Sequence, residues 1–171
     1  MAIGLGALTA GFALLALWPE PTGYGVIAVV LTSLGLGDGL AITTSAAVLV
    51  SAVPAERAGQ AGAVSETSYE LGVGPGVALL GSIHAAVYHA RLGPLPLEGE
   101  QLRTARESAG GAHDVAQDIG GAQGAAVLRA ASDAFDSALT TTAYVSAALV
   151  AVAAVLTVAL VPKDFKVTGT H

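Results

Sequence analysis

Two glutamates, Glu66 and Glu70, lie in an otherwise apolar stretch between Gln60 and Tyr88. Because they are four residues apart, a helix projects them from one face, one turn above the other. A carboxylate in hydrocarbon costs about 2.5–3.5 kcal/mol on insertion scales, so apolar helices seldom keep one without a use for it. Loss of water favours the neutral acid, and a second acid nearby favours it further. The pair is therefore predicted to exchange protons or to bind a cation.

Two further side chains belong to this candidate site. Asp38 lies roughly 21 Å along the preceding apolar segment, counted from Tyr24, which is a depth comparable to that of Glu70. Tyr69, next to Glu70, offers an aromatic face to a cationic substrate. We expect Asp38, Glu66 and Glu70 to serve proton coupling or substrate binding. The alternative is that serine, threonine and backbone groups cap these acids at a helix break that has no transport role.

Glycines surround the acids on both segments and indicate closely packed, mobile helices. A proline in the second segment removes a helix hydrogen bond and can kink the span. Gly72 and Gly76 form a small-xxx-small pair, which lets two helix backbones approach closely. The residues with this expected packing or kinking role are Gly35, Gly37, Gly39, Gly72, Gly74, Pro75, Gly76 and Gly81.

The composition predicts an all-α integral membrane protein. Hydrophobic residues make up 53% of the chain and charged residues only 12%, whereas a soluble domain has about a quarter charged residues. The absence of cysteine excludes disulfides and thiolate metal sites. A net charge of -6 argues against nucleic acid as a partner. Lipid, protons and a small-molecule substrate are the expected partners.

Hydropathy and the positions of helix-breaking proline and glycine residues divide the chain into four predicted spans. They cover about residues 2–18, 24–53, 61–88 and 141–161, with a long polar loop over 89–140 and a tail over 162–171. The first is short, because a helix rising 1.5 Å per residue needs about 20 residues to cross the hydrocarbon. Positive charge at Arg57, Lys163 and Lys166 places the second turn and the tail in the cytoplasm, and hence the long loop outside. The membrane concerned is the plasma membrane.

The long loop contains two short amphipathic segments, 98–108 and 124–139. In the second, Leu128, Ala131, Phe135 and Leu139 share a stripe at helical spacing. We expect this stripe to pack against the membrane domain.

Enzymatic and metal chemistry are weakly supported. Gly35-Leu36-Gly37-Asp38 fits the G-x-G-D pattern of intramembrane aspartyl proteases, but the second acid such an enzyme needs would be Glu70 in place of an aspartate. His84 and His89 have no further ligand type nearby. We therefore predict no enzyme activity, no cofactor and no metal.

The stretch from Leu34 to Ile83 resembles the late helices of major facilitator superfamily exporters. The closer similarity is to the fourteen-helix drug:proton antiporter branch, which includes multidrug and quaternary-ammonium exporters. The matching motifs are a P-x-E-R-x-G-x-A-G turn over 54–62, an S-E-T-x-Y-E-L-G run over 65–72, a G-V-A-L-L-G-S run over 76–82 and an A-R-E-S-x-G-G-A run over 105–112.

This resemblance implies that the four spans are helices eleven to fourteen of such an exporter, the last part of its C-terminal lobe. The second span would line the substrate cavity and the third would lie near the interface between lobes, with Glu66 and Glu70 at the acidic positions of the thirteenth helix. A complete member is roughly three times longer. We therefore expect the C-terminal portion of a proton-coupled efflux transporter for small cationic or amphipathic compounds, incomplete alone. The missing N-terminal helices, or a partner chain, would complete it. The alternative is a truncated product or small membrane subunit that packs on a partner without transporting.

Overall fold

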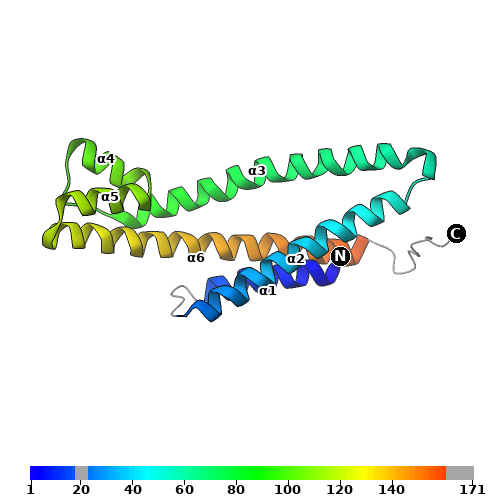
Figure 1. Ribbon diagram of the computed structural model, residues 1–171, viewed down its shortest axis with the longest axis horizontal. Coiled ribbons are helices and arrows are strands. Elements are labelled where there is room, and N and C mark those ends of the chain that lie inside the picture. The colour runs from blue at the N-terminus through cyan, green and yellow to red at the C-terminus, as the bar shows by residue number, and fades with distance from the viewer. Residues whose placement is uncertain (18–22, 161–171) are drawn as a thin grey trace. The chain divides into compact units, whose positions relative to one another are not determined.

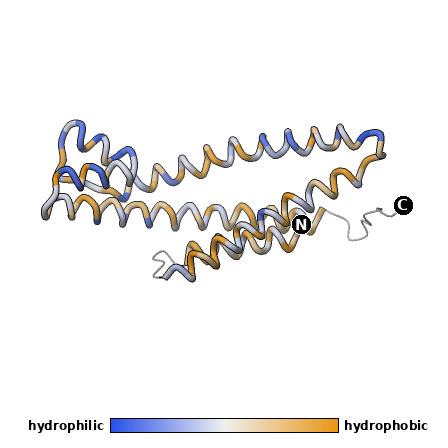
Figure 2. The backbone as a smooth tube through the Cα atoms, viewed as in Figure 1, coloured by the Kyte–Doolittle hydropathy of each residue, from blue (hydrophilic) through white to orange (hydrophobic). Residues whose placement is uncertain are grey.

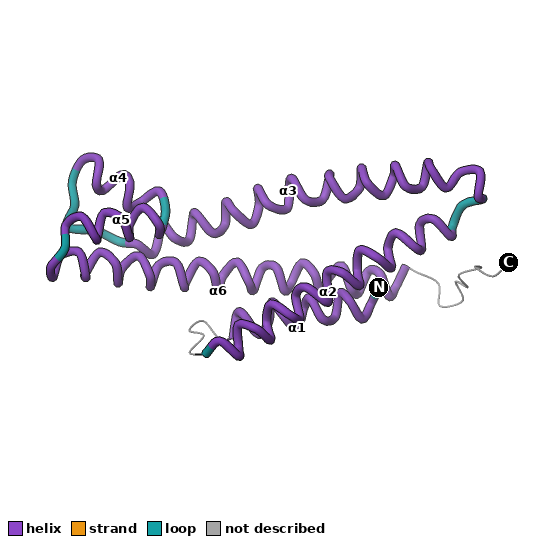
Figure 3. The backbone as a smooth tube through the Cα atoms, in the orientation of Figure 1, coloured by secondary structure: helices purple, strands orange, loops and turns teal. Residues whose placement is uncertain are grey.

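The computed structural model describes residues 1–17 and 23–160, and within those ranges the chain is helical apart from short links and contains no strand (Figures 1 and 3). The helices are α1 (Ala2–Leu17), α2 (Tyr24–Ser51), a 3-10 turn (Ala55–Arg57), α3 (Ala58–Leu92), α4 (Gly99–Glu107), α5 (Ala109–Ile119) and α6 (Gly121–Leu160). The all-α class is confirmed. The end of the first expected span at Trp18, the end of the fourth at Val161 and the predicted tail at 162–171 lie outside the described residues.

The helices form two compact units. One comprises Met1–Leu79 together with the chain from Ala143 onward, and the other comprises Leu80–Thr142. We call them the span unit and the cap unit. Helices α3 and α6 contribute one part of their length to each, whereas α1 and α2 belong to the span unit, and α4 and α5 to the cap unit.

Among the described residues, three helical stretches are long and apolar enough to cross a membrane: Tyr24–Ser51, Ala55–Leu92 and Gly121–Leu160. The first expected span, α1, has 16 residues, which at 1.5 Å per residue gives about 24 Å. That length falls short of the roughly 30 Å of bilayer hydrocarbon. The described chain therefore shows three of the four expected spans by length and hydropathy.

Hydrophobic residues occupy much of α2 and of the last part of α6 (Figure 2), and many of their large aliphatic side chains are exposed. Val29 and Leu31 of α2 are 57% and 62% exposed, and Val155 of α6 is 67% exposed. A soluble surface rarely presents so much contiguous apolar area. This exposure agrees with a multi-pass membrane protein, whose aliphatic surface faces lipid or further helices.

Glycines hold α1 and α2 together. A Cβ atom added at Gly37 would lie 2.7 Å from the Leu8 backbone nitrogen and 2.9 Å from the Gly4 carbonyl oxygen, and one at Gly11 would meet the side chain of Leu34. Helices in hydrocarbon gain little from hiding apolar surface, so close van der Waals contact is what joins them. Of the expected packing glycines, Gly37 lies at such a contact.

The other expected packing glycines have open surroundings in the described chain. An added Cβ would meet nothing within 4 Å at Gly35, Gly39, Gly72, Gly74, Gly76 or Gly81. Pro75 lies inside α3, which continues through it. The packing and kinking roles of these residues stay predictions.

Helices α3 and α6 are longer than the sequence indicated. They have 35 and 40 residues, or about 52 and 60 Å at 1.5 Å per residue, whereas spans of 61–88 and 141–161 were expected. Much of the region expected as a loop over 89–140 is helical. The polar side chains of this region suit contact with water, but they do not oppose helix formation. Alanine, the best helix former, recurs along the region. The Thr141 hydroxyl donates to the Ser137 carbonyl 2.8 Å away, within one continuous helix.

The cap unit has a core of small side chains. Val127, Ala131, Ala134 and Ala138 of α6 are at most 1% exposed. They pack with residues of α3, α4, α5 and the link before α4: Tyr88, Leu92, Leu97, Ala105, Ala112, Val115 and Ala116. The predicted stripe was therefore wrong in register. Ala131 is buried, but Leu128 and Phe135 are 38% and 39% exposed, because alanines let the helices approach too closely to seat larger side chains between them.

Sharp links and long-range hydrogen bonds close the cap unit. Gly120 and Gly121 have φ values of 64° and 59°, a left-handed conformation that glycine adopts without strain, and they join α5 to α6 directly. The Tyr88 hydroxyl donates to the Ala105 carbonyl at 3.0 Å, and the Gln123 amide donates to the Pro96 carbonyl at 2.7 Å. These contacts tie the end of α3 to α4 and the link before α4 to the start of α6.

Substitution of Gly37 by alanine tests the α1–α2 contact. Overpacking of a tight contact costs about 1–3 kcal/mol, so Gly37→Ala should lower the thermal unfolding midpoint of the chain in detergent micelles. Gly39→Ala is the matched control, because its Cβ would enter open space. Equal midpoints for the two variants would contradict the contact.

Substitution of Ala134 by leucine tests the cap core in the same way. The added bulk should destabilise the unit by about 1–3 kcal/mol, seen as faster amide hydrogen exchange across residues 80–142. Ala126→Leu changes an exposed position of the same helix and should leave exchange unchanged. If both variants exchange alike, Ala134 is not part of a packed core.

Candidate functional site

A groove of about 570 Å³ lies between α2 and the first part of α3, inside the span unit. Its two walls differ in chemistry. Helix α2 supplies small and aliphatic side chains, and α3 supplies hydroxyls, a carboxylate and an aromatic ring. The lining residues are Ala41, Ile42, Ser45, Ala46 and Leu49 on α2, and Ser65, Glu66, Ser68 and Tyr69 on α3.

A tight turn brings the two walls together. Helix α2 ends at Ser51, and the amide of Ala52 still donates to the Val48 carbonyl at 3.0 Å. Pro54 cannot continue that helix, and its carbonyl accepts from the Arg57 amide at 2.9 Å to form the 3-10 turn. Helix α3 begins one residue later, so its first turns start beside the last turns of α2.

Helical spacing selects the polar wall. Glu66 and Tyr69 are three residues apart and so share one face of α3, as do Ser65 and Ser68. In the described part of the chain, Glu66 has no salt-bridge partner, and the observed ion pair, Arg103 with Glu100, lies in the cap unit. The Glu66 carboxylate is therefore available to a bound cation or a proton.

The four predicted site residues do not all meet. Glu66 and Tyr69 line the groove together, whereas Tyr69 was expected beside Glu70. All three acids are exposed, but Glu70, one turn beyond Glu66, and Asp38 are not among the lining residues. Measured from the turn that joins the two helices, Asp38 is about 20 Å along α2 and Glu70 about 18 Å along α3. Their distances along the two helices are therefore comparable, as the sequence indicated.

The family resemblance implied that the second span lines the cavity, but it did not name the residues of the α2 wall. The run Thr43-Thr44-Ser45 carried the signal, because hydroxyls in an apolar helix mark a face that contacts other protein or water. Ser45 donates to the Ala41 carbonyl at 2.7 Å, and Thr43 donates to the Gly39 carbonyl at 2.7 Å. Such bonds satisfy the hydroxyl hydrogens within the helix and leave the oxygens able to accept.

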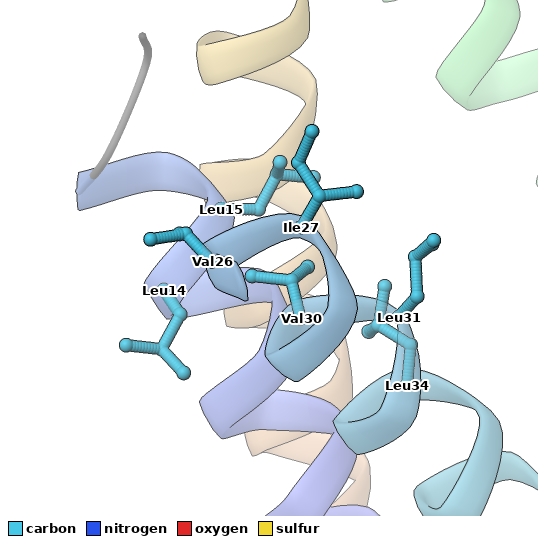
Figure 4. A pocket seen from close by; sticks show the side chains of 7 residues that line it. All are labelled: Leu14, Leu15, Val26, Ile27, Val30, Leu31 and Leu34. Atoms are coloured by element: carbon cyan, nitrogen blue, oxygen red, sulfur yellow. The ribbon is translucent and has the colours of Figure 1, made fainter. Parts of the chain in front are cut away.

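A second cavity is chemically different. It measures about 110 Å³, lies between α1 and α2, and is lined only by aliphatic side chains: Leu14, Leu15, Val26, Ile27, Val30, Leu31 and Leu34 (Figure 4). No charged or hydroxyl group is available there to orient a ligand. Of the two cavities, the groove on α3 is the candidate site.

Metal ligands do not gather in the described residues, where no group of three His, Asp or Glu side chains could hold an ion. His84 instead packs its ring edge-to-face against Phe135 in the cap unit, with ring centroids 5.3 Å apart.

The chain is similar to known drug-resistance and efflux proteins. The chain is 41% identical over 155 residues to the multidrug efflux pump LfrA of Mycolicibacterium smegmatis, a match over 90% of this chain and 31% of that protein. It is 36% identical over 103 residues to the methyl viologen resistance protein SmvA of Salmonella typhimurium, over 60% of this chain and 21% of that protein. The chain thus spans less than a third of each relative's length. No protein-family model matches it. With its exporter motifs, its helical membrane architecture and these relatives, the chain is similar to the drug exporters of the major facilitator superfamily and is consistent with a portion of such a protein.

Proposed function

We propose that this chain is the C-terminal portion of a proton-coupled efflux transporter for small organic compounds, cationic or amphipathic, in the plasma membrane. The observation that carries the proposal is the groove, which places Glu66 beside Tyr69 on a helix long and apolar enough to span a membrane. The names of the two relatives, a multidrug efflux pump and a methyl viologen resistance protein, support export of drug-like molecules.

The groove suits an organic cation that is partly apolar. The carboxylate of Glu66 attracts positive charge, and the ring face of Tyr69 attracts it through the aromatic quadrupole at a gain of about 0.5–2 kcal/mol. The opposite wall of α2 offers Ile42 and Leu49 to the apolar part of the same molecule. Methyl viologen, the compound in the name of the Salmonella relative, is a flat aromatic dication with both properties.

Coupling to protons follows from the two carboxylates. Glu66 and Glu70 are one helical turn apart, so two negative charges at these positions repel each other. A bound cation relieves the repulsion, and so does a proton. In the proposed exchange, a proton entering from outside neutralises Glu70 or Glu66, releases the substrate and favours return to the inward-facing state.

The remaining helices of the transporter are the proposed partner. Alternating access needs one helix bundle to rock against another around a midplane site, and both relatives are more than three times as long as the part this chain matches. The open surroundings of Gly72 and Gly76 on α3 suit close packing against such helices. The same openness would serve a non-transporting subunit that packs on a partner, and transport assays separate the two.

The proposed orientation places the α2–α3 turn, which holds Arg57, in the cytoplasm together with the C-terminus. The cap unit then lies outside the cell. Its Arg103 pairs with Glu100 in full exposure, and the carboxylate raises the pKa of that guanidinium further above its ordinary value. Such a solvated pair suits an aqueous compartment.

Glutamine substitution at both carboxylates tests the coupling. In the gene context in which the chain occurs, Glu66→Gln with Glu70→Gln should abolish export driven by a pH gradient in proteoliposomes, because neither site can then bind and release a proton. Glu56→Gln, in the turn outside the groove, is the matched control and should keep export. Unchanged efflux by the double variant would contradict proton coupling through these two carboxylates.

A further inference from the structure

The α2 wall of the groove has a notch at its centre. Two small side chains, Ser45 and Ala46, lie between the larger Ile42 and Leu49 along the same helix, and all four line the groove. Ser45 and Ala46 are partly buried. The notch therefore is the place on this wall where an added side chain would most reduce the space inside the groove.

The opposite wall supplies the polar groups of the groove. Ser65, Glu66, Ser68 and Tyr69 lie within five consecutive residues of α3, and the short turn at Ala55–Arg57 connects α3 to α2. The charged group that attracts a cation is therefore on α3, and the smallest side chains of the lining are on α2.

We propose that Ser45 and Ala46 set the upper size limit of the exported cation. The inference rests on the proposed function, because it concerns the substrate of the same groove. A small cation reaches Glu66 without using the notch, whereas a large planar aromatic cation must place part of its ring system there. Ser45 and Ala46 are thus specificity-determining residues, distinct from the carboxylates that bind charge.

Neighbouring alanines of α2 differ in whether they line the groove. Ala47 is next to Ala46, but it is exposed and does not line the groove, since successive residues of a helix point about 100° apart. Added bulk at Ala46 should exclude large substrates, and the same bulk at Ala47 should not.

The experiment compares export of tetraethylammonium and ethidium by cells that express the chain in its gene context. Ala46→Phe should lower ethidium export at least about tenfold, within the range by which apolar pockets discriminate on size, and leave tetraethylammonium export within about twofold. Ala47→Phe should match the wild type for both. Leu49→Ala, which widens the groove, should raise ethidium export relative to tetraethylammonium, an outcome that misfolding cannot produce.

Each result decides a separate point. If the wild type exports both cations but Ala46→Phe lowers neither, or lowers both in the same proportion at an unchanged membrane level, the size limit is not set at the notch and the inference fails alone. If Ala46→Phe does not reach the membrane, Ala46→Leu and Leu49→Ala decide by the same ratio. If the wild type exports neither cation, the proposed function fails and the inference fails with it.

Discussion

The free-energy cost of a carboxylate in hydrocarbon governs how this chain is built around Glu66 and Glu70. Each ionised acid opposes insertion by about 2.5–3.5 kcal/mol at the centre of a span, and two acids one turn apart add their mutual repulsion. The groove between α2 and α3 places Glu66 in the same lining as the hydroxyls of Ser45, Ser65 and Ser68 and the ring of Tyr69. Polar neighbours of this kind lower the cost of an acid in a span, and a bound cation or a proton that neutralises the acid lowers it further.

The two units are packed in different ways, and the surroundings of each unit, lipid or water, explain the difference. In the span unit, apolar surface has no reason to avoid lipid, so α1 and α2 associate where Gly4 and Gly37 let their backbones meet. In the cap unit, the core of alanines and Val127 is buried with Tyr88 and Leu92, as in a small water-soluble helical domain. Helices α3 and α6 take part in both units, so one continuous helix carries the acids in the span unit and Tyr88 in the cap core.

The sequence was sufficient for the helical class and for the ends of α2 to within two residues, because Gly23 and Pro54 flank a continuous apolar run. The resemblance placed the second span at the cavity, but the sequence did not show which residues of α2 form the wall. A span that is apolar on every face gives no contrast to show which side meets α3, and the turn at Pro54–Arg57 decides it. The polar connection over 89–140 is mostly helix. Its two predicted amphipathic segments, 98–108 and 124–139, fall on α4 and α6, but α5 and the full lengths of α3 and α6 were not predicted, because alanine-rich helices can be as polar as a loop. The stripe at Leu128 and Phe135 missed the true core at Val127 and Ala134 because the largest apolar residues were assumed to be the buried ones.

Access of water to the groove distinguishes a transport site from a packed helix pair most directly. The chain has no cysteine, so single cysteines can be placed at Ser68, which lines the groove, and at Leu71, which is 69% exposed but lies outside it. Reaction with a water-soluble maleimide in membranes requires a hydrated thiolate. A transport groove predicts fast labelling at Ser68→Cys, slowed by an added organic cation, and slow labelling at Leu71→Cys, which faces lipid or helix. Equal, slow labelling at both positions would contradict a water-accessible site at Glu66.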